Sequence, residues 1–215
     1  MSDEFPMKQS LEHWVGTSRI LAIVFTHIVD STRLGRALVD EHWIEILRKH
    51  VAKARSLMNR YSCYEIKMIG DLFMAAFRSA IDALDFALAF HADSGDEMLR
   101  VRAGIHVGPV RVFENDLFGM MVNYTKRVES TRNPDLIVIR DEAKRHIDYE
   151  KASRHSLLHF NAREISFKGF DEPQKVWYVL YPGMMQLLRE KQNNAKELIS
   201  KPSPAAQVLK KVWFG

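Results

Sequence analysis

Apolar and polar positions along the first half of the chain predict strands and helices in turn. The run from Ile20 to Ile28 is almost wholly apolar, as expected of a buried strand. Between Glu41 and Arg60 apolar residues recur every three or four positions, as on one face of a helix. The expected elements are strand Ile20–Ile28, helix Glu41–Arg60 with Ile44, Leu47, Val51, Ala54 and Met58 on its buried face, strand Cys63–Lys67, strand Leu72–Phe77, a helix around Leu84, and strand Leu99–Val107, with Val110–Phe113 pairing back onto that strand as a hairpin.

This order of elements, strand–helix–strand–strand–helix–strand, is typical of a ferredoxin-like fold (βαββαβ) of the α+β class. In that fold the first strand lies beside the third. The end of the first strand, at His27, should therefore lie close to the turn at Asp71, where Gly70 permits a tight reversal.

The second half of the chain predicts additional C-terminal α/β elements. They are a helix over Phe118–Thr131, a strand over Leu136–Ile139, a helix over Asp141–Ile147, strands over Arg163–Phe167 and Lys175–Leu180, and a helix over Gly183–Ser200. We expect an N-terminal lead-in at residues 1–18, one domain over 19–182, and a C-terminal helix and tail over 183–215.

Composition narrows the class of protein. The 31 basic and 27 acidic residues give a net charge of +4 that is spread along the chain, so nucleic acid is not an expected partner. The single cysteine, Cys63, excludes an intrachain disulfide and is typical of a reducing cytoplasm. We expect a cytoplasmic protein without a membrane span, because no apolar run reaches roughly 18–20 residues. An RNA-binding ferredoxin-like domain would need aromatic residues on adjacent central strands, which this pattern lacks.

Two stretches carry candidate chemistry. KMIGD (67–71) presents Asp71 at the tip of a turn, and DLFGMMVNYTKR (116–127) places Asn123 and Arg127 four residues apart, on one helix face. Taken singly, the first is typical of a surface hairpin and the second of a solvated helix face.

Five motifs together are far more specific: VFTHIVDST (24–32), KMIGD (67–71), AGIHVG (103–108), DLFGMMVNYTKRVES (116–130) and FKGFDEP (167–173). In order and spacing, the chain from about residue 19 to 181 resembles the class III nucleotidyl cyclases. The resemblance implies a homodimer, with each active site built from both chains, that converts ATP or GTP to the 3′,5′-cyclic monophosphate and pyrophosphate. The ribose 3′-hydroxyl attacks the α-phosphorus, assisted by two divalent cations, Mg²⁺ or Mn²⁺.

The resemblance also assigns roles to individual residues. Asn123 matches the asparagine that orients the ribose, and Arg127 matches the arginine that stabilises charge on the transferring phosphate. Lys67 and Asp116 match the pair that reads the base. Since a lysine donor and an aspartate acceptor suit adenine but not guanine, the expected substrate is ATP. Lys168 is assigned to the triphosphate.

The implied metal site departs from the family pattern. Asp71 matches one metal-binding aspartate and Ile28 belongs to the same site, but His27 stands where the other aspartate is found. Imidazole is neutral, offers one nitrogen and cannot bridge two cations, and it suits Mn²⁺ better than Mg²⁺. We therefore expect one cation to bind poorly, and Asp30 does not replace the missing carboxylate.

Three readings of His27 remain open. The first is a weak or inactive cyclase homologue that still binds nucleotide or serves as a dimeric regulatory module. The second is an adenylate cyclase with one good metal site that favours Mn²⁺, and the third is a different metal chemistry. We expect an adenylate cyclase of low activity, with the catalytically inactive module as the alternative.

The remaining histidines are expected to be structural. His42, His50 and His91 should lie on helix surfaces, and His106 should pack in the core.

Overall fold

The computed structural model describes residues 10–38, 40–130 and 135–200, so the beginning of the predicted lead-in and the C-terminal tail lie outside the described residues. The helices and strands are α1 (Leu11–Val15), β1 (Ile20–Ile28), α2 (Ser31–Ala37), α3 (Asp40–Arg60), β2 (Tyr64–Ile69), β3 (Leu72–Phe77), α4 (Ala80–Ala92), β4 (Val101–Pro109), β5 (Arg111–Phe113), β6 (Asp116–Phe118), α5 (Met120–Glu129), β7 (Ile137–Arg140), α6 (Asp141–Glu150), β8 (His159–Ile165), β9 (Gln174–Leu180) and α7 (Met184–Ser200).

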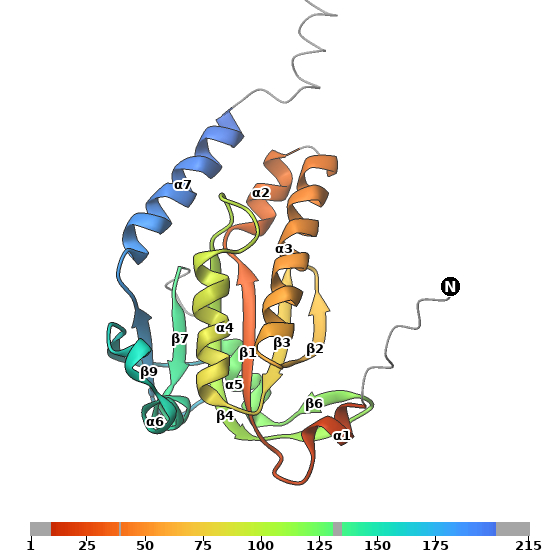
Figure 1. The fold of residues 1–215 in the computed structure, drawn as a ribbon, viewed down its shortest axis with the longest axis vertical. Coiled ribbons are helices and arrows are strands. Elements are labelled where there is room, and N and C mark those ends of the chain that lie inside the picture. Colours follow the sequence, from red (N-terminus) through yellow and green to blue (C-terminus); the bar gives the residue numbers. More distant parts are fainter. Residues whose placement is uncertain (1–9, 39, 131–134, 201–215) are drawn as a thin grey trace, which may run out of the picture.

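Seven strands form one mixed sheet in the order β2-β3-β1-β4-β7-β9-β8, with β1 near its centre (Figure 1). β1 runs antiparallel to β3 on one side and to β4 on the other, while β4 and β7 are parallel. The first strand thus lies beside the third, and the predicted ferredoxin-like α+β fold is confirmed, with the elements from β7 onward as its C-terminal additions.

The sheet is covered on both faces. Helices α3, α4 and α6 pack on one face, and α1, α5 and the β5–β6 hairpin lie on the other (Figure 1). Successive residues of β1 enter the two layers in turn: Ala22 and Val24 join the first core, and Leu21 and Ile23 join the second. Because both faces of β1 are buried, its sequence is almost wholly apolar instead of alternating.

The buried face of α3 differs from the prediction. Ile44, expected in the core, is 47% exposed, because the helix is rotated about its axis relative to the expected stripe. The buried residues of α3 are Ile46, His50, Ala54, Leu57 and Met58.

Two histidines predicted on helix surfaces are buried instead. The ring of His50 stacks on Phe90 at 4.7 Å between centroids, and its Nδ1 lies 2.8 Å from the carbonyl oxygen of Ser94. The ring of His91 lies between the Tyr181 hydroxyl (2.7 Å) and the Asp135 carbonyl (2.9 Å). Burial lowers the pKa of His91 to about 4, so it is a neutral structural residue.

The predicted pairing of Val110–Phe113 with the preceding strand is wrong. β5 pairs with β6 instead, with Phe113 opposite Asp116. The turn between them consists of Glu114 and Asn115, whose positive φ angles of 48° and 57° reverse the chain within two residues. As a result α5 begins at Met120, two residues after its predicted start.

The C-terminal helix α7 packs beside the end of β1. Its residues Ala195, Leu198 and Ile199 contact a core cluster that includes Ile28 and Leu34. Lys191 of α7 is buried and donates to the Ser94 hydroxyl and the Leu99 carbonyl, at 3.0 and 2.9 Å. Within the described ranges, none of the helices combines the length and apolar character that a membrane span needs.

Candidate functional site

The pairing of β1 with β3 brings three predicted site residues together. The turn after β2 reverses at Gly70, whose φ of +61° favours glycine, and presents Asp71 toward the end of β1. The Nε2 atom of His27 lies 3.4 Å from Oδ1 of Asp71. The backbone N–H of Ile28 donates to Oδ2 of the same carboxylate at 3.1 Å. Both oxygens of Asp71 therefore have partners within the chain.

A buried carboxylate on α5 holds the other side of the His27 ring. Oε1 of Glu129 lies 3.3 Å from Nδ1 of His27 and 2.6 Å from Nε of Arg102, and its Oε2 accepts from Lys126 at 2.9 Å. The Glu129 side chain is 0% exposed. A buried carboxylate is stable only when it is paired in this way. Sequence reasoning missed Glu129 and Arg102 altogether.

Gly104 of β4 allows α5 to come this close. A Cβ atom at position 104 would lie 2.8 Å from both the Cα of Glu129 and the carbonyl oxygen of Thr125. A glycine inside a strand often marks such a close backbone approach, so Gly104 was the available sequence signal for a helix packed here.

The two carboxylates shift the charge state of His27. The hydrogen bond with Asp71, and after it the one with Glu129, raise the pKa of His27 to about 9 against the opposing effect of burial. Arg102 acts in the other direction, since its Nη2 lies 2.8 Å from Nδ1 and can donate only to an unprotonated nitrogen. Nε2–H is directed at Asp71 in either state.

These residues do not fit a pair of divalent cations as they stand. A two-cation site needs carboxylate oxygens that are free to bridge, whereas the oxygens of Asp71 and Glu129 and both nitrogens of His27 face protein partners. Asp30 does not join them, because it accepts from Arg100 at 3.1 Å. In the part of the chain that the structure describes, no group of three or more histidine, cysteine or acidic residues could hold a metal.

The predicted base-reading pair meets on a different part of the molecule. Lys67 on β2 and Asp116 on β6 form a direct ion pair, although they lie far apart in the sequence. A bulge between Glu65 and Lys67 shifts the strand register there, which re-aims side chains. The second oxygen of Asp116 accepts from the Leu117 N–H at 2.8 Å. The two paired side chains are 35% and 26% exposed, so a ligand can reach them.

The other predicted residues lie on α5 and on the turn that follows β8. Asn123 is exposed, and Arg127 places its guanidinium over the ring of Phe170 at 5.2 Å. Among the described residues, Nη1 of Arg127 has no hydrogen-bond partner. Lys168 is exposed in the turn beside Gly169, and a Cβ at Gly169 would lie 3.3 Å from that same nitrogen. The structure thus brings Arg127 close to the turn that carries Lys168.

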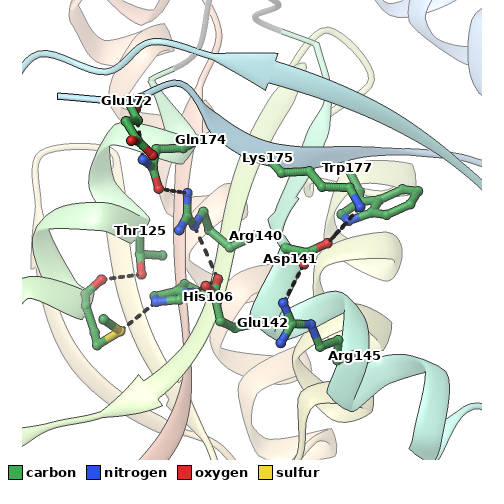
Figure 2. Close-up of polar contacts among 11 residues, drawn as sticks. His106, Thr125, Arg140, Asp141, Glu142, Arg145, Glu172, Gln174, Lys175 and Trp177 are labelled. Atoms are coloured by element: carbon green, nitrogen blue, oxygen red, sulfur yellow. Dashed lines mark hydrogen bonds and ion pairs between the residues drawn. The ribbon is translucent and has the colours of Figure 1, made fainter. Parts of the chain in front are cut away.

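A polar cluster behind α5 fixes this helix to the sheet. His106 on β4 contacts Met121 of α5, and Arg140 on β7 donates to Gln174 at 2.9 Å and lies near Glu142 (Figure 2). Arg140 also covers the ring of Tyr124, 5.0 Å from its centroid. His106 packs in the core as predicted, and burial lowers its pKa to about 4.

Comparisons with known proteins bear on this arrangement. The family model described as the adenylate and guanylate cyclase catalytic domain matches residues 16–181. The chain is 26% identical over 206 residues to receptor-type adenylate cyclase GRESAG 4.2 of Trypanosoma brucei brucei, covering 73% of this chain and 36% of that protein. It is 32% identical over 117 residues to an adenylate cyclase of Streptomyces griseus, covering 54% of this chain and 29% of that protein. The chain thus spans about a third of the length of these relatives.

Solved structures show the same fold. A Trypanosoma brucei adenylate cyclase, described in its monomeric state, superposes with a TM-score of 0.64 at 25% identity, covering 75% of this chain and 88% of that one. The adenylyl cyclase CyaB of P. aeruginosa superposes with a TM-score of 0.63 at 20% identity, covering 75% and 93%, which establishes a common fold alone.

Proposed function

Because the chain belongs to the family of adenylate and guanylate cyclase catalytic domains, we propose that two copies of it bind ATP between them and convert it slowly to 3′,5′-cyclic AMP and pyrophosphate. The catalytic unit in this proposal is residues 19–182. Its curated relatives named above are adenylate cyclases, which supports ATP as the substrate.

The ion pair between Lys67 and Asp116 is the observation that carries this proposal. An ammonium group can donate to a ring nitrogen of adenine, and a carboxylate can accept from its exocyclic amine. Guanine carries an oxygen in place of that amine and would face the carboxylate with an acceptor, leaving both unsatisfied. Two residues far apart in the sequence supply a matched donor and acceptor at one accessible place, as adenine recognition requires.

Asn123 and Arg127 are proposed to act on the sugar and the phosphate. Asn123 orients the ribose so that its 3′-oxygen forms a bond to the α-phosphorus while the bond to the departing pyrophosphate breaks. Arg127 stabilises the negative charge that develops on the transferring phosphate. Its guanidinium lies over the ring of Phe170, beside the turn that carries the exposed Lys168, which is proposed to bind the triphosphate.

A low rate is expected because His27 is held between Asp71 and Glu129. The same observation favours a second candidate function, a nucleotide-binding or dimeric regulatory module without turnover. The two candidates share the adenine site and differ only in whether the phosphate side of the site can promote bond formation.

An assay for product separates them. The purified full chain is incubated with ATP or GTP, each with Mg²⁺ and with Mn²⁺, and cyclic nucleotide is measured by mass spectrometry. Slow cyclic AMP formation, faster with Mn²⁺ and without cyclic GMP, supports the enzyme. Calorimetric binding of ATP without cyclic AMP under either cation supports the module, and the absence of ATP binding contradicts both.

A further inference from the structure

A cavity of about 610 Å³ opens beside His27, between the end of β1, helix α2 and strand β4. Its lining includes three arginines, Arg33, Arg36 and Arg102, together with Ser31 and Thr32. The cavity therefore lies where the family resemblance places the cations, but its lining is rich in positive charge.

The ion pairs at the cavity leave two of these arginines unmatched. Arg102 is engaged by Glu129 at 2.6 Å, and Asp30, the acidic residue of the lining, accepts from Arg100 at 3.1 Å. Arg33 and Arg36 are exposed, three residues apart on one face of α2, and neither forms an ion pair with any described residue.

The carboxylates that face His27 do not cancel this charge. Glu129 is shared by Arg102 and Lys126, and Asp71 accepts from Ile28 and faces His27. A site that is to hold Mg²⁺ needs an excess of free carboxylate oxygens. This cavity has the opposite balance, an excess of guanidinium groups.

We propose that the cavity binds the polyphosphate group of ATP directly, through Arg33 and Arg36, without a divalent cation. Guanidinium groups carry a permanent charge and present paired N–H donors that match phosphate oxygens. In this arrangement fixed side chains supply the positive charge that mobile cations supply elsewhere in the family. The identity of the ligand as ATP rests on the proposed function, whereas the binding of polyphosphate without metal rests on the cavity alone.

Isothermal titration calorimetry on the full chain tests the inference with two probes, ATP and inorganic tripolyphosphate, each in EDTA and in Mg²⁺. We expect both probes to bind in EDTA at least as tightly as in Mg²⁺, and more weakly as salt is raised. The double substitution Arg33→Ala/Arg36→Ala should weaken both probes by about tenfold or more. The matched control Arg48→Ala/Lys49→Ala removes the same charge from exposed positions of α3 and should bind like the parent chain.

Binding that requires a divalent cation, or a loss that is the same in both double variants, would overturn the inference. Circular dichroism of each variant shows that it is folded, and the charge-conserving Arg33→Lys/Arg36→Lys should retain most of the binding.

The two proposals fail in different ways. Arginine-dependent tripolyphosphate binding in EDTA, without preference for ATP over GTP, supports this inference and contradicts the adenine site. Preference for ATP that depends on Lys67 and also on Mg²⁺ supports the adenine site and overturns this inference.

Discussion

Two regions of the molecule differ in how their charged side chains are paired: the base-reading region around Lys67 and Asp116, and the phosphate region around His27. In both regions charged side chains of the chain face one another. The Lys67–Asp116 pair is about one-third exposed and joins two surface elements, so a ligand can replace each partner. His27 is instead held by Glu129, whose side chain is fully buried at the end of α5. The side chain of His27 is 26% exposed, like that of Asp116, so the two regions differ in whether the partner of the site residue can be reached. The difference teaches that a ligand can displace an accessible partner but not a buried one.

The largest expected effect comes from returning a carboxylate to position 27. His27→Asp removes the ring that faces Asp71 and Glu129 and restores an oxygen ligand for a cation. We expect cyclic AMP formation with Mn²⁺ to rise by about a hundredfold, or about 3 kcal/mol in the activation free energy. The measurement is initial rate against Mn²⁺ and Mg²⁺ concentration.

The control for this change is His27→Asn, which has nearly the same shape as aspartate but no charge. A rise in rate with asparagine equal to that with aspartate would show that removal of the ring alone is responsible. No rise with either residue would mean that the phosphate region is not what limits the reaction.

A somewhat smaller effect should follow from Gly104→Ala, because Gly104 lets α5, which carries Glu129 and Arg127, pack closely against β4. A new Cβ would meet the Cα of Glu129 at 2.8 Å, so α5 must move, carrying Arg127 with it. We expect the free energy of unfolding to fall by about 2 kcal/mol, as in other overpacked cores. Urea denaturation followed by circular dichroism gives this value.

Gly70→Ala provides the comparison for that experiment. Its Cβ would meet nothing within 4 Å, but its φ of +61° strains any other residue, so a loss of only about 1 kcal/mol is expected. Equal losses at the two positions would contradict the close approach of α5 to β4.

Replacing one carboxylate oxygen of Asp116 by an amide nitrogen should change the preference between ATP and GTP more than it changes stability. Asp116→Asn keeps the shape of the side chain but adds donors that can face the guanine oxygen. We expect the ratio of ATP to GTP affinity to fall by about tenfold, measured by calorimetry. Asp148→Asn, on the exposed face of α6, should leave the ratio unchanged. Any change in the ratio with Asp148→Asn as large as that with Asp116→Asn would remove the case for base reading.

The smallest effect is a pH dependence of stability from His27. Its pKa is raised from 6.5 to about 9 in the folded chain, so the folded state holds the proton more tightly and is stabilised below pH 6.5. That stabilisation is lost as the pH rises through 9. Because Arg102 competes for Nδ1, we expect a loss of only about 1 kcal/mol across this window.

The comparison for this effect is His27→Gln. The free energy of unfolding of this variant should lack the loss that His27 causes as the pH rises from 6.5 through 9. Burial lowers the pKa of Lys191 to about 8, so in both proteins the free energy of unfolding rises with pH above that value. The measurement is therefore the difference between the two proteins in the free energy of unfolding at each pH. Parallel curves for the two proteins would mean that His27 keeps its ordinary pKa.

The sequence predicted the elements and their pairing well where the apolar pattern was strong. The run Ile20–Ile28 became a buried central strand, and the order of elements alone implied that His27 would meet Asp71. Both predictions depend on the period of apolar residues and on the topology of one common fold, which a single sequence contains.

The predictions failed where distant parts of the chain decide the outcome. The rings of His50 and His91 are buried, and each forms a hydrogen bond with a backbone carbonyl more than 40 residues away. The local sequence pattern contains no information about such distant partners. In the sequence Glu129 is a polar residue at the end of a helix; its burial depends on Arg102 and His27, which pair with its side chain from two strands. The turn between β5 and β6 has two residues with positive φ, and only the second, Asn115, is of a type that favours this conformation.

The direct contact between Lys67 and Asp116 has a consequence for which molecules can bind there. The two charges neutralise each other, so the pair attracts neither stray anions nor stray cations. A purine can enter only by replacing an ion pair with two hydrogen bonds of its own. A molecule that forms only one of these two hydrogen bonds should gain almost no binding free energy. Discrimination then depends on replacing both partners of the ion pair, not on the strength of either hydrogen bond.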